Sequence, residues 1–158
     1  MKANLDKAIG YLLEDEGGYA ERATEPGGAV NMGVSFATFV SWRASEKKPK
    51  PTFADLKAMT VAEATAIYTA LYATPIGFNA LAGGLDYAAL DAAVNEGLHG
   101  ALGLLSITSP LKDMKTRIGA ISDVRLLVKK LRPEWAKDGP GWTARIGGRV
   151  VSRASAMV

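Results

Sequence analysis

The chain of 158 residues contains no cysteine and a single histidine, His99. The absence of cysteine excludes disulfide bonds and thiolate metal sites. One histidine leaves no set of imidazoles for a metal centre and makes a serine–histidine–aspartate triad improbable. Carboxylates are therefore the best-supplied catalytic groups, and we expect no metal and no cofactor.

The sequence also lacks a long apolar run. No stretch approaches the roughly 18–20 consecutive residues that a membrane-spanning helix needs. The first residues, MKANLDKAIGYLLEDEGG, carry acidic side chains where a signal peptide has its apolar core. We therefore expect synthesis in the cytoplasm without a signal peptide, and no transmembrane segment.

Charge is divided unevenly along the chain. Hydrophobic residues make up 48% and charged residues 22%, a composition typical of a folded domain with a packed core. The net charge is +3, but residues 112–158 carry 11 basic and 4 acidic side chains, whereas residues 1–111 carry 8 and 12. The basic region suits an anionic partner such as nucleic acid, lipid headgroups or a cell-wall polymer. A solvated helical face is the alternative interpretation.

Hydrophobic periodicity predicts a mostly α single domain. Helices are expected over residues 3–15, 36–44, 61–73, 86–105 and from Met114 to Pro133. Ser35, Thr52 and Thr60 are expected to cap helices. Turn signals favour at most a small β-hairpin near residues 19–34, and KDGPGW, at residues 137–142, reads as a turn.

The helix that begins at Met114 has the most regular pattern. Its apolar residues recur at steps of three and four, which predicts that they form its buried face with lysine and arginine elsewhere. These residues are Met114, Ile118, Ile121, Val124, Val128 and Leu131.

The first helix ends in three neighbouring acids, Glu14, Asp15 and Glu16. The apolar stripe through Ile9 and Leu12 continues to position 16, so we expect Glu16 to point inward and the other two away. Burial and the negative end of the helix dipole both favour a protonated carboxyl, and such a carboxyl can act as a general acid. The alternative is that Glu16 is a helix-end residue in water.

A proton donor for glycoside cleavage needs a second polar group, which acts as a nucleophile or positions a water molecule. Glu25, on the proline–glycine turn EPGG, is the nearest candidate, and Glu21 is a weaker one. In lysozyme, a carboxylic acid in an apolar pocket protonates the glycosidic oxygen in this way.

The stretch EGGYAERATEPGGAVNMGVS resembles the N-terminal signature of glycoside hydrolase family 108, muramidases found among phage endolysins and secretion-associated lysozymes. The residues that match this signature are Glu16, Gly17, Gly18, Tyr19, Gly27, Gly28, Asn31 and Gly33. LDAAVNEGLHGAL and GWTARI resemble the family's predicted peptidoglycan-binding region. In these two stretches the matching residues are Asp91, Asn95, Gly97, Gly141, Trp142 and Arg145.

The resemblance implies a lysozyme-like helical fold, with a catalytic region at residues 1–82 and a peptidoglycan-binding region at 83–158 packed as one unit. It implies that Glu16 is the catalytic acid, and we expect Glu25 to assist it. Tyr19, Asn31 and Asn95 are expected to bind substrate. Glu25 stands where the family usually has aspartate and Val30 where it has threonine, so one hydroxyl is missing.

The function implied is that of an N-acetylmuramidase that cleaves the β-1,4 bond between MurNAc and GlcNAc, as a phage or prophage endolysin. It would reach the periplasmic wall through a holin or a secretion system, act as a monomer and contact anionic envelope components through its basic region. The alternative is a catalytically inactive peptidoglycan-binding module. A nucleic-acid binder rests only on the charge, and we expect no specific nucleic acid.

Overall fold

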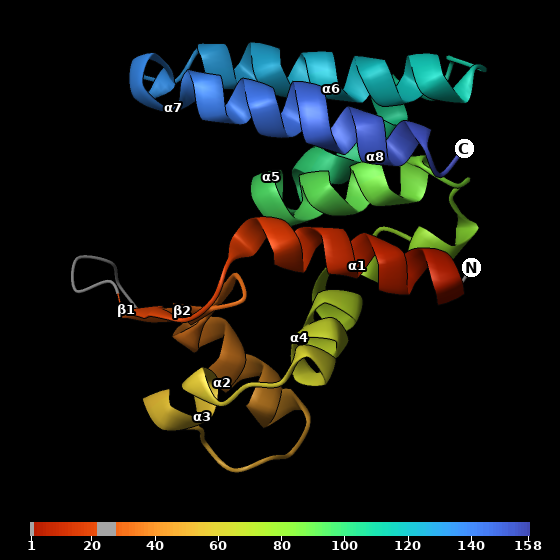
Figure 1. Cartoon of the computed structure of the whole chain (residues 1–158). Helices are drawn as coiled ribbons and strands as arrows, with labels where there is room; N and C mark the ends of the chain where they lie inside the picture. The colour runs from red at the N-terminus through yellow and green to blue at the C-terminus, as the bar shows by residue number, and fades with distance from the viewer. Residues whose placement is uncertain (1, 22–27) are drawn as a thin grey trace. The chain divides into compact units, whose positions relative to one another are not determined.

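The computed structural model describes residues 2–21 and 28–158 of the chain. These residues are mostly helical, with one small sheet (Figure 1). The helices are α1 (Lys2–Glu16), α2 (Phe36–Ser45), α3 (Phe53–Lys57), α4 (Val61–Tyr68), α5 (Leu85–Ile107), α6 (Met114–Lys130), α7 (Trp135–Trp142) and α8 (Val151–Ser155). Three further turns are η1 (Thr69–Ala73) and η3 (Thr143–Val150), both π-helical, and η2 (Phe78–Ala80), a 3₁₀ turn. The predicted mostly α fold is confirmed.

The chain divides into two compact units. The N-terminal unit contains residues 6–71, and the C-terminal unit contains residues 1–5 and 72–158. The sequence predicted a catalytic region at 1–82 and a binding region at 83–158. The compact units are divided at residue 71, and the first turn of α1 belongs with the C-terminal unit. The functional division at residue 82 stays a prediction.

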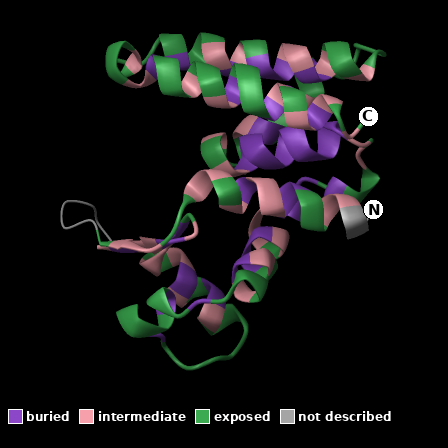
Figure 2. Cartoon of the chain, in the orientation of Figure 1, coloured by how far each residue is buried: buried purple, intermediate pink, exposed green. Residues whose placement is uncertain are grey.

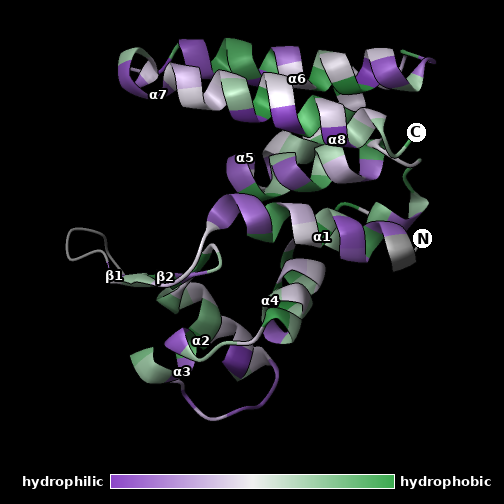
Figure 3. Cartoon of the chain, in the orientation of Figure 1, coloured by the Kyte–Doolittle hydropathy of each residue, from purple (hydrophilic) through white to green (hydrophobic). Residues whose placement is uncertain are grey.

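Local capping explains where the helices of the N-terminal unit begin. The hydroxyl of Ser35 accepts a hydrogen bond from the backbone N–H of Thr38, and this bond starts α2. Thr52 and Asp55 form a reciprocal capping box at α3, and Thr60 caps α4. The predicted caps are confirmed. The connection from α2 to α3, residues 46–52, is hydrophilic (Figure 3).

The sheet is antiparallel, with the order β1 (Ala20–Glu21), β2 (Ala29–Asn31), β3 (Val34–Ser35). Asn31 pairs with Val34 across a two-residue turn. Both turn residues have positive φ, 47° at Met32 and 74° at Gly33. These values are those of a type I′ turn, whose twist matches that of a β-hairpin. The predicted small hairpin is therefore present and is extended by one strand.

The first half of α5 forms the core of the C-terminal unit, since every residue from Leu85 to Ala93 is buried (Figure 2). Two glycines precede this helix. A Cβ on Gly83 would lie 2.5 Å from the carbonyl oxygen of Met157, so its absence lets the end of the chain pack closely there. At Gly97, φ is 81° and ψ is 166°, and this conformation kinks the helix.

The predicted buried face of α6 is correct for its first half and wrong for its second. Ile118 and Ile121 are buried, but Val128 is 50% and Leu131 81% exposed. The buried positions after Ile121 are polar instead: Ser122, Arg125 and Lys129. Acidic partners on α5 favour burial of the cations and so shift the buried face.

The turn predicted at residues 137–142 is also wrong, because these residues continue α7, which runs on through η3 into α8. Figure 1 shows this helical run lying alongside α6. Gly139 is buried against the ring of Trp135, where an added Cβ would come within 2.8 Å of ring carbons. The hydroxyl of Thr143 donates to the carbonyl of Gly139. This packing holds the helix despite the N–H that Pro140 lacks.

Candidate active site

Glu16 is the last residue of α1. Gly17 follows it with φ of 75°, a left-handed conformation that glycine adopts at low cost and that ends the helix. Ile9 and Leu12 on the predicted stripe are buried, Glu16 is half-buried and Glu14 is exposed. Asp15 is also half-buried, so burial distinguishes Glu16 from Glu14 but not from Asp15.

The side chain of Glu16 lies against the turn between β2 and β3. A Cβ built on Gly33 would stand 2.9 Å from Cγ and 3.0 Å from Oε2 of Glu16. These separations are shorter than van der Waals contact, so the carboxyl occupies space that any other residue at position 33 would fill. The turn therefore depends on Gly33 both for its positive φ and for its lack of a side chain.

Tyr68, at the end of α4, completes this arrangement. Its hydroxyl donates a 2.9 Å hydrogen bond to the carbonyl of Met32, the residue before Gly33 in the turn. The same hydroxyl would be the nearest atom to a Cβ at Gly33. The ring of Tyr68 is buried. Three separate elements thus meet at one glycine, with the Glu16 carboxyl beside the turn. We define Glu16, Met32, Gly33 and Tyr68 as the Glu16 site.

The second catalytic residue predicted from the sequence, Glu25, lies outside the described residues. The weaker candidate, Glu21, is an exposed residue of β1. Its carboxylate accepts a 2.9 Å hydrogen bond from the hydroxyl of Tyr19. This bond raises the pKa of the Tyr19 phenol above its ordinary value, with smaller contributions from desolvation and from the charge of Glu21.

Tyr19, predicted to bind substrate, lines a shallow groove of about 440 Å³ together with Glu21, Gly28, Ala29 and Phe53. The ammonium group of Lys57 lies 5.4 Å from the centre of its ring. The groove thus presents two aromatic side chains and a carboxylate. Sugars bind to such surfaces through ring stacking and hydroxyl hydrogen bonds.

Asn31, also predicted to bind substrate, is buried, and its amide nitrogen has backbone partners. It donates to the carbonyls of Leu56 at 2.9 Å and Lys57 at 3.3 Å. These bonds tie β2 to the end of α3. The sequence patterns gave no sign of this structural role, and substrate binding by Asn31 stays a prediction.

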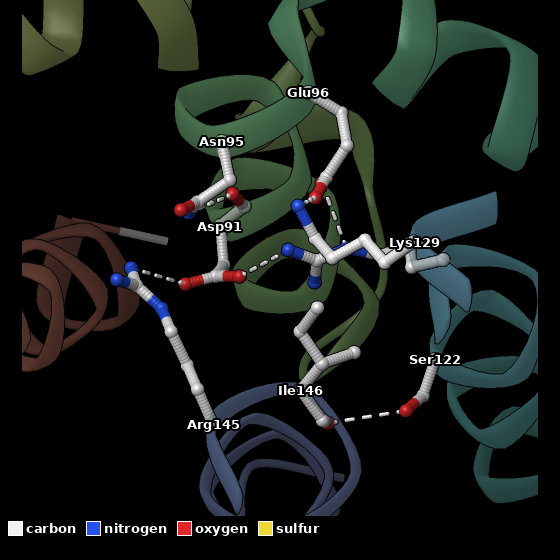
Figure 4. Close-up of polar contacts among 8 residues, drawn as sticks. Asp91, Asn95, Glu96, Ser122, Lys129, Arg145 and Ile146 are labelled. Carbon is white, nitrogen blue, oxygen red and sulfur yellow. Dashed lines mark hydrogen bonds and ion pairs between the residues drawn. The ribbon is translucent and has the colours of Figure 1, made fainter. Parts of the chain in front are cut away.

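Three motif residues of the C-terminal unit, Asp91, Asn95 and Arg145, belong to a separate polar network centred on the buried Asp91 (Figure 4). Asp91 is fully buried and accepts from Arg125 at 2.7 Å and from Arg145 at 3.1 Å. The two stretches that contain Asp91 and Arg145 are therefore brought together in space. Asn95, predicted to bind substrate, donates to the carbonyl of Asp91 at 2.8 Å and is otherwise exposed.

Glu96 extends this network. It pairs with Arg125 at 2.8 Å and with Lys129 at 3.1 Å. Sequence periodicity missed Arg125, because a cation on α6 gives no local sign that its partners lie on α5. In the described part of the chain no group of three or more acidic, histidine or cysteine side chains is placed to hold a metal ion. None of the helices described is long and apolar enough to span a bilayer.

The chain was compared with protein families and with solved structures. The sequence model of the family Glycosyl hydrolase 108 matches residues 9–97, which include the Glu16 site and Asp91. The chain is also similar to the solved structure of Brucella abortus SagA, with 32% sequence identity and a TM-score of 0.82. That match covers 99% of this chain and 97% of SagA. No curated protein sequence matches.

Proposed function

The chain belongs to glycoside hydrolase family 108, and on this premise we propose that it is a lysozyme-type N-acetylmuramidase. Its substrate is the peptidoglycan glycan strand, and the bond that it cleaves is the β-1,4 bond between MurNAc and GlcNAc. The observation that carries the proposal is the position of Glu16 inside the family-matched region, with its side chain against the β2–β3 turn that Tyr68 holds through Met32.

In this proposal Glu16 donates a proton to the oxygen of the leaving sugar, so that an oxocarbenium-like centre develops on the ring left behind. A second carboxylate stabilises that centre or orients a water molecule. Glu25 is our first candidate and Glu21 our second. Tyr19 and Asn95 contact the glycan, and Asn31 holds β2 in place or contacts it as well.

The test is a matched pair of variants, Glu16→Gln and Glu14→Gln, assayed on purified peptidoglycan by loss of turbidity and release of reducing ends. Both changes replace a carboxyl group by an amide near the end of α1, and the side chain of Glu16 is the one that lies against Gly33 of the turn. We expect Glu16→Gln to lose nearly all activity and Glu14→Gln to keep it. Full activity of folded Glu16→Gln would overturn the assignment.

A second candidate function is that of a catalytically inactive peptidoglycan-binding module. Val30 favours it, because threonine is usual there in the family and the hydroxyl is absent. The same assay distinguishes the two functions, because a binding module would sediment with peptidoglycan and release no new reducing ends. If the missing hydroxyl is what inactivates the chain, Val30→Thr should restore the release of reducing ends that the parent chain lacks.

We also propose a place of action for the enzyme. The chain acts as a monomeric phage or prophage endolysin that reaches the periplasm through a holin or a secretion system. Its basic region contacts anionic envelope components, an attraction that salt weakens. Expression in bacteria should cause lysis with a co-expressed holin and not without one. Lysis by the chain alone would contradict this route.

A further inference from the structure

The C-terminal end of α6 carries apolar side chains that the fold leaves in solvent. Leu127 is 61%, Val128 50% and Leu131 81% exposed. At spacings of one, three and four residues, they share one face of the helix. Single exposed apolar residues are ordinary on protein surfaces, whereas a large contiguous apolar patch is typical of an interaction site.

This ridge borders an apolar groove between α6 and the second half of α5. The groove has a volume of about 410 Å³ and includes Leu104, Ile107, Val124 and Val128 in its lining. Ile107 is itself 60% exposed. Gly103 also lines the groove, and a Cβ built on it would have no atom within 4 Å. The ridge and the groove together form one surface, which we call the α5–α6 apolar surface.

The charge at the Leu131 end of this surface is positive, whereas the exposed Asp123 lies one turn before Leu127 at the other end. Lys130 and Arg132 are exposed beside Leu131, and Arg132 also lines the groove. The acidic residue in the lining is Glu96, and its two oxygens face Arg125 and Lys129 at 2.8 and 3.1 Å. Its negative charge is therefore neutralised within the network. The surface therefore presents apolar side chains next to two cations, Lys130 and Arg132.

We propose that the α5–α6 apolar surface docks the protein on an anionic lipid bilayer. Helices that bind to a membrane surface carry leucines on one face with lysine and arginine beside them. The apolar side chains enter the boundary of the acyl chains, and the cations pair with anionic headgroups. The groove gives an acyl chain a place against Leu104 and Ile107. This attachment is independent of glycan cleavage, because neither the ridge nor the groove includes Glu16.

The experiment measures co-sedimentation of the full chain with vesicles of phosphatidylglycerol and phosphatidylcholine in equal parts, and with vesicles of phosphatidylcholine alone. We expect binding to the first and little to the second. Leu127→Glu and Leu131→Glu should each lower the partition constant about tenfold, as expected for the loss of one buried leucine. The double variant Lys130→Glu/Arg132→Glu should have a lower partition constant than either leucine variant. High salt should lower the partition constant of the parent chain in the same direction.

The matched control is Val61→Glu, which places the same charge at an apolar residue 61% exposed in the other unit. It should bind vesicles as the parent chain does, and circular dichroism and melting temperature check that every variant folds. Equal binding to neutral vesicles, or equal loss in Val61→Glu and Leu131→Glu, would overturn the proposal. So would a dimer in sedimentation velocity that Leu131→Glu dissociates, because the surface would then bind a second copy.

Discussion

Replacement of Gly33 by alanine tests the Glu16 site most directly, because it adds one methyl group at the point where three elements meet. The new Cβ would lie 2.9 Å from Cγ of Glu16 and nearer still to the hydroxyl of Tyr68. Carbon atoms rest at about 3.5–4.0 Å from each other, so Glu16 must move by roughly 0.5–1 Å. Tyr68 must move as well, which strains its hydrogen bond to Met32.

The loss of stability has two parts that a control separates. Alanine at positive φ costs about 1–2 kcal/mol wherever it occurs. Gly77 has φ of 69° and no atom within 4 Å of an added Cβ, so Gly77→Ala should show this part alone. At Gly33 the overlap adds about 1–3 kcal/mol. At about 2–4 °C per kcal/mol for a chain of this size, Gly33→Ala should melt several degrees below Gly77→Ala.

The effect on activity should exceed the effect on folding. A shift of the reacting group by about 1 Å costs roughly a hundredfold in rate, so we expect kcat of Gly33→Ala to fall between about tenfold and a hundredfold. Gly77→Ala should keep kcat. The assay is release of reducing ends from peptidoglycan at a temperature where both variants are folded.

A second substitution sharpens this test. Tyr68→Phe in the Gly33→Ala background removes the atom nearest to the new methyl group, so it should recover part of the stability while Glu16 stays displaced and kcat stays low. The reasoning is refuted if Gly33→Ala matches Gly77→Ala in melting temperature and retains the kcat of the parent chain.

Two further predictions concern stability. Asp91→Asn should lower the free energy of unfolding in urea by about 3–5 kcal/mol, because it removes a carboxylate that pairs with the buried Arg125. The control is Glu63→Gln, which breaks a partly exposed ion pair and should cost no more than about 1 kcal/mol. Equal losses of stability in the two variants would contradict the value for Asp91→Asn. Hydrogen bonds from the hydroxyl and then the backbone N–H of Thr116 lower the pKa of Asp113, the cap of α6, below its ordinary 3.8. The stabilisation from the Asp113 charge is therefore complete above pH 3.8 and is lost as pH falls through the lower pKa of the folded state. The difference in melting temperature between the parent chain and Asp113→Asn should shrink as pH falls from about 5 to about 2.5. A difference in melting temperature that stays constant with pH would show that the charge of Asp113 does not stabilise the fold.

Glu16 shows how far the sequence reaches into the site. The periodicity of α1 indicated which face Glu16 lies on, and the motif indicated that Gly33 matters. Neither indicated that Gly33 leaves the space for the Glu16 carboxyl or that Tyr68 holds the turn. Those contacts join residues 17 and 35 positions apart, and no pattern within a helix or a turn records them.

The sequence alone determined the features whose causes lie within a few residues. Ser35 caps α2 because its hydroxyl reaches an N–H three residues later. At α3 the hydroxyl of Thr52 accepts from the N–H of Asp55, and the carboxylate of Asp55 accepts from the N–H of Thr52. The tertiary structure decided which face of α6 is buried and whether the chain turns at Pro140. Arg125 is buried because Asp91, on another helix, offsets its charge, and α7 continues because Trp135 packs over Gly139. Packing and ion pairs between distant residues outweigh local helix preferences of about 1–3 kcal/mol, so only the folded chain settles these features.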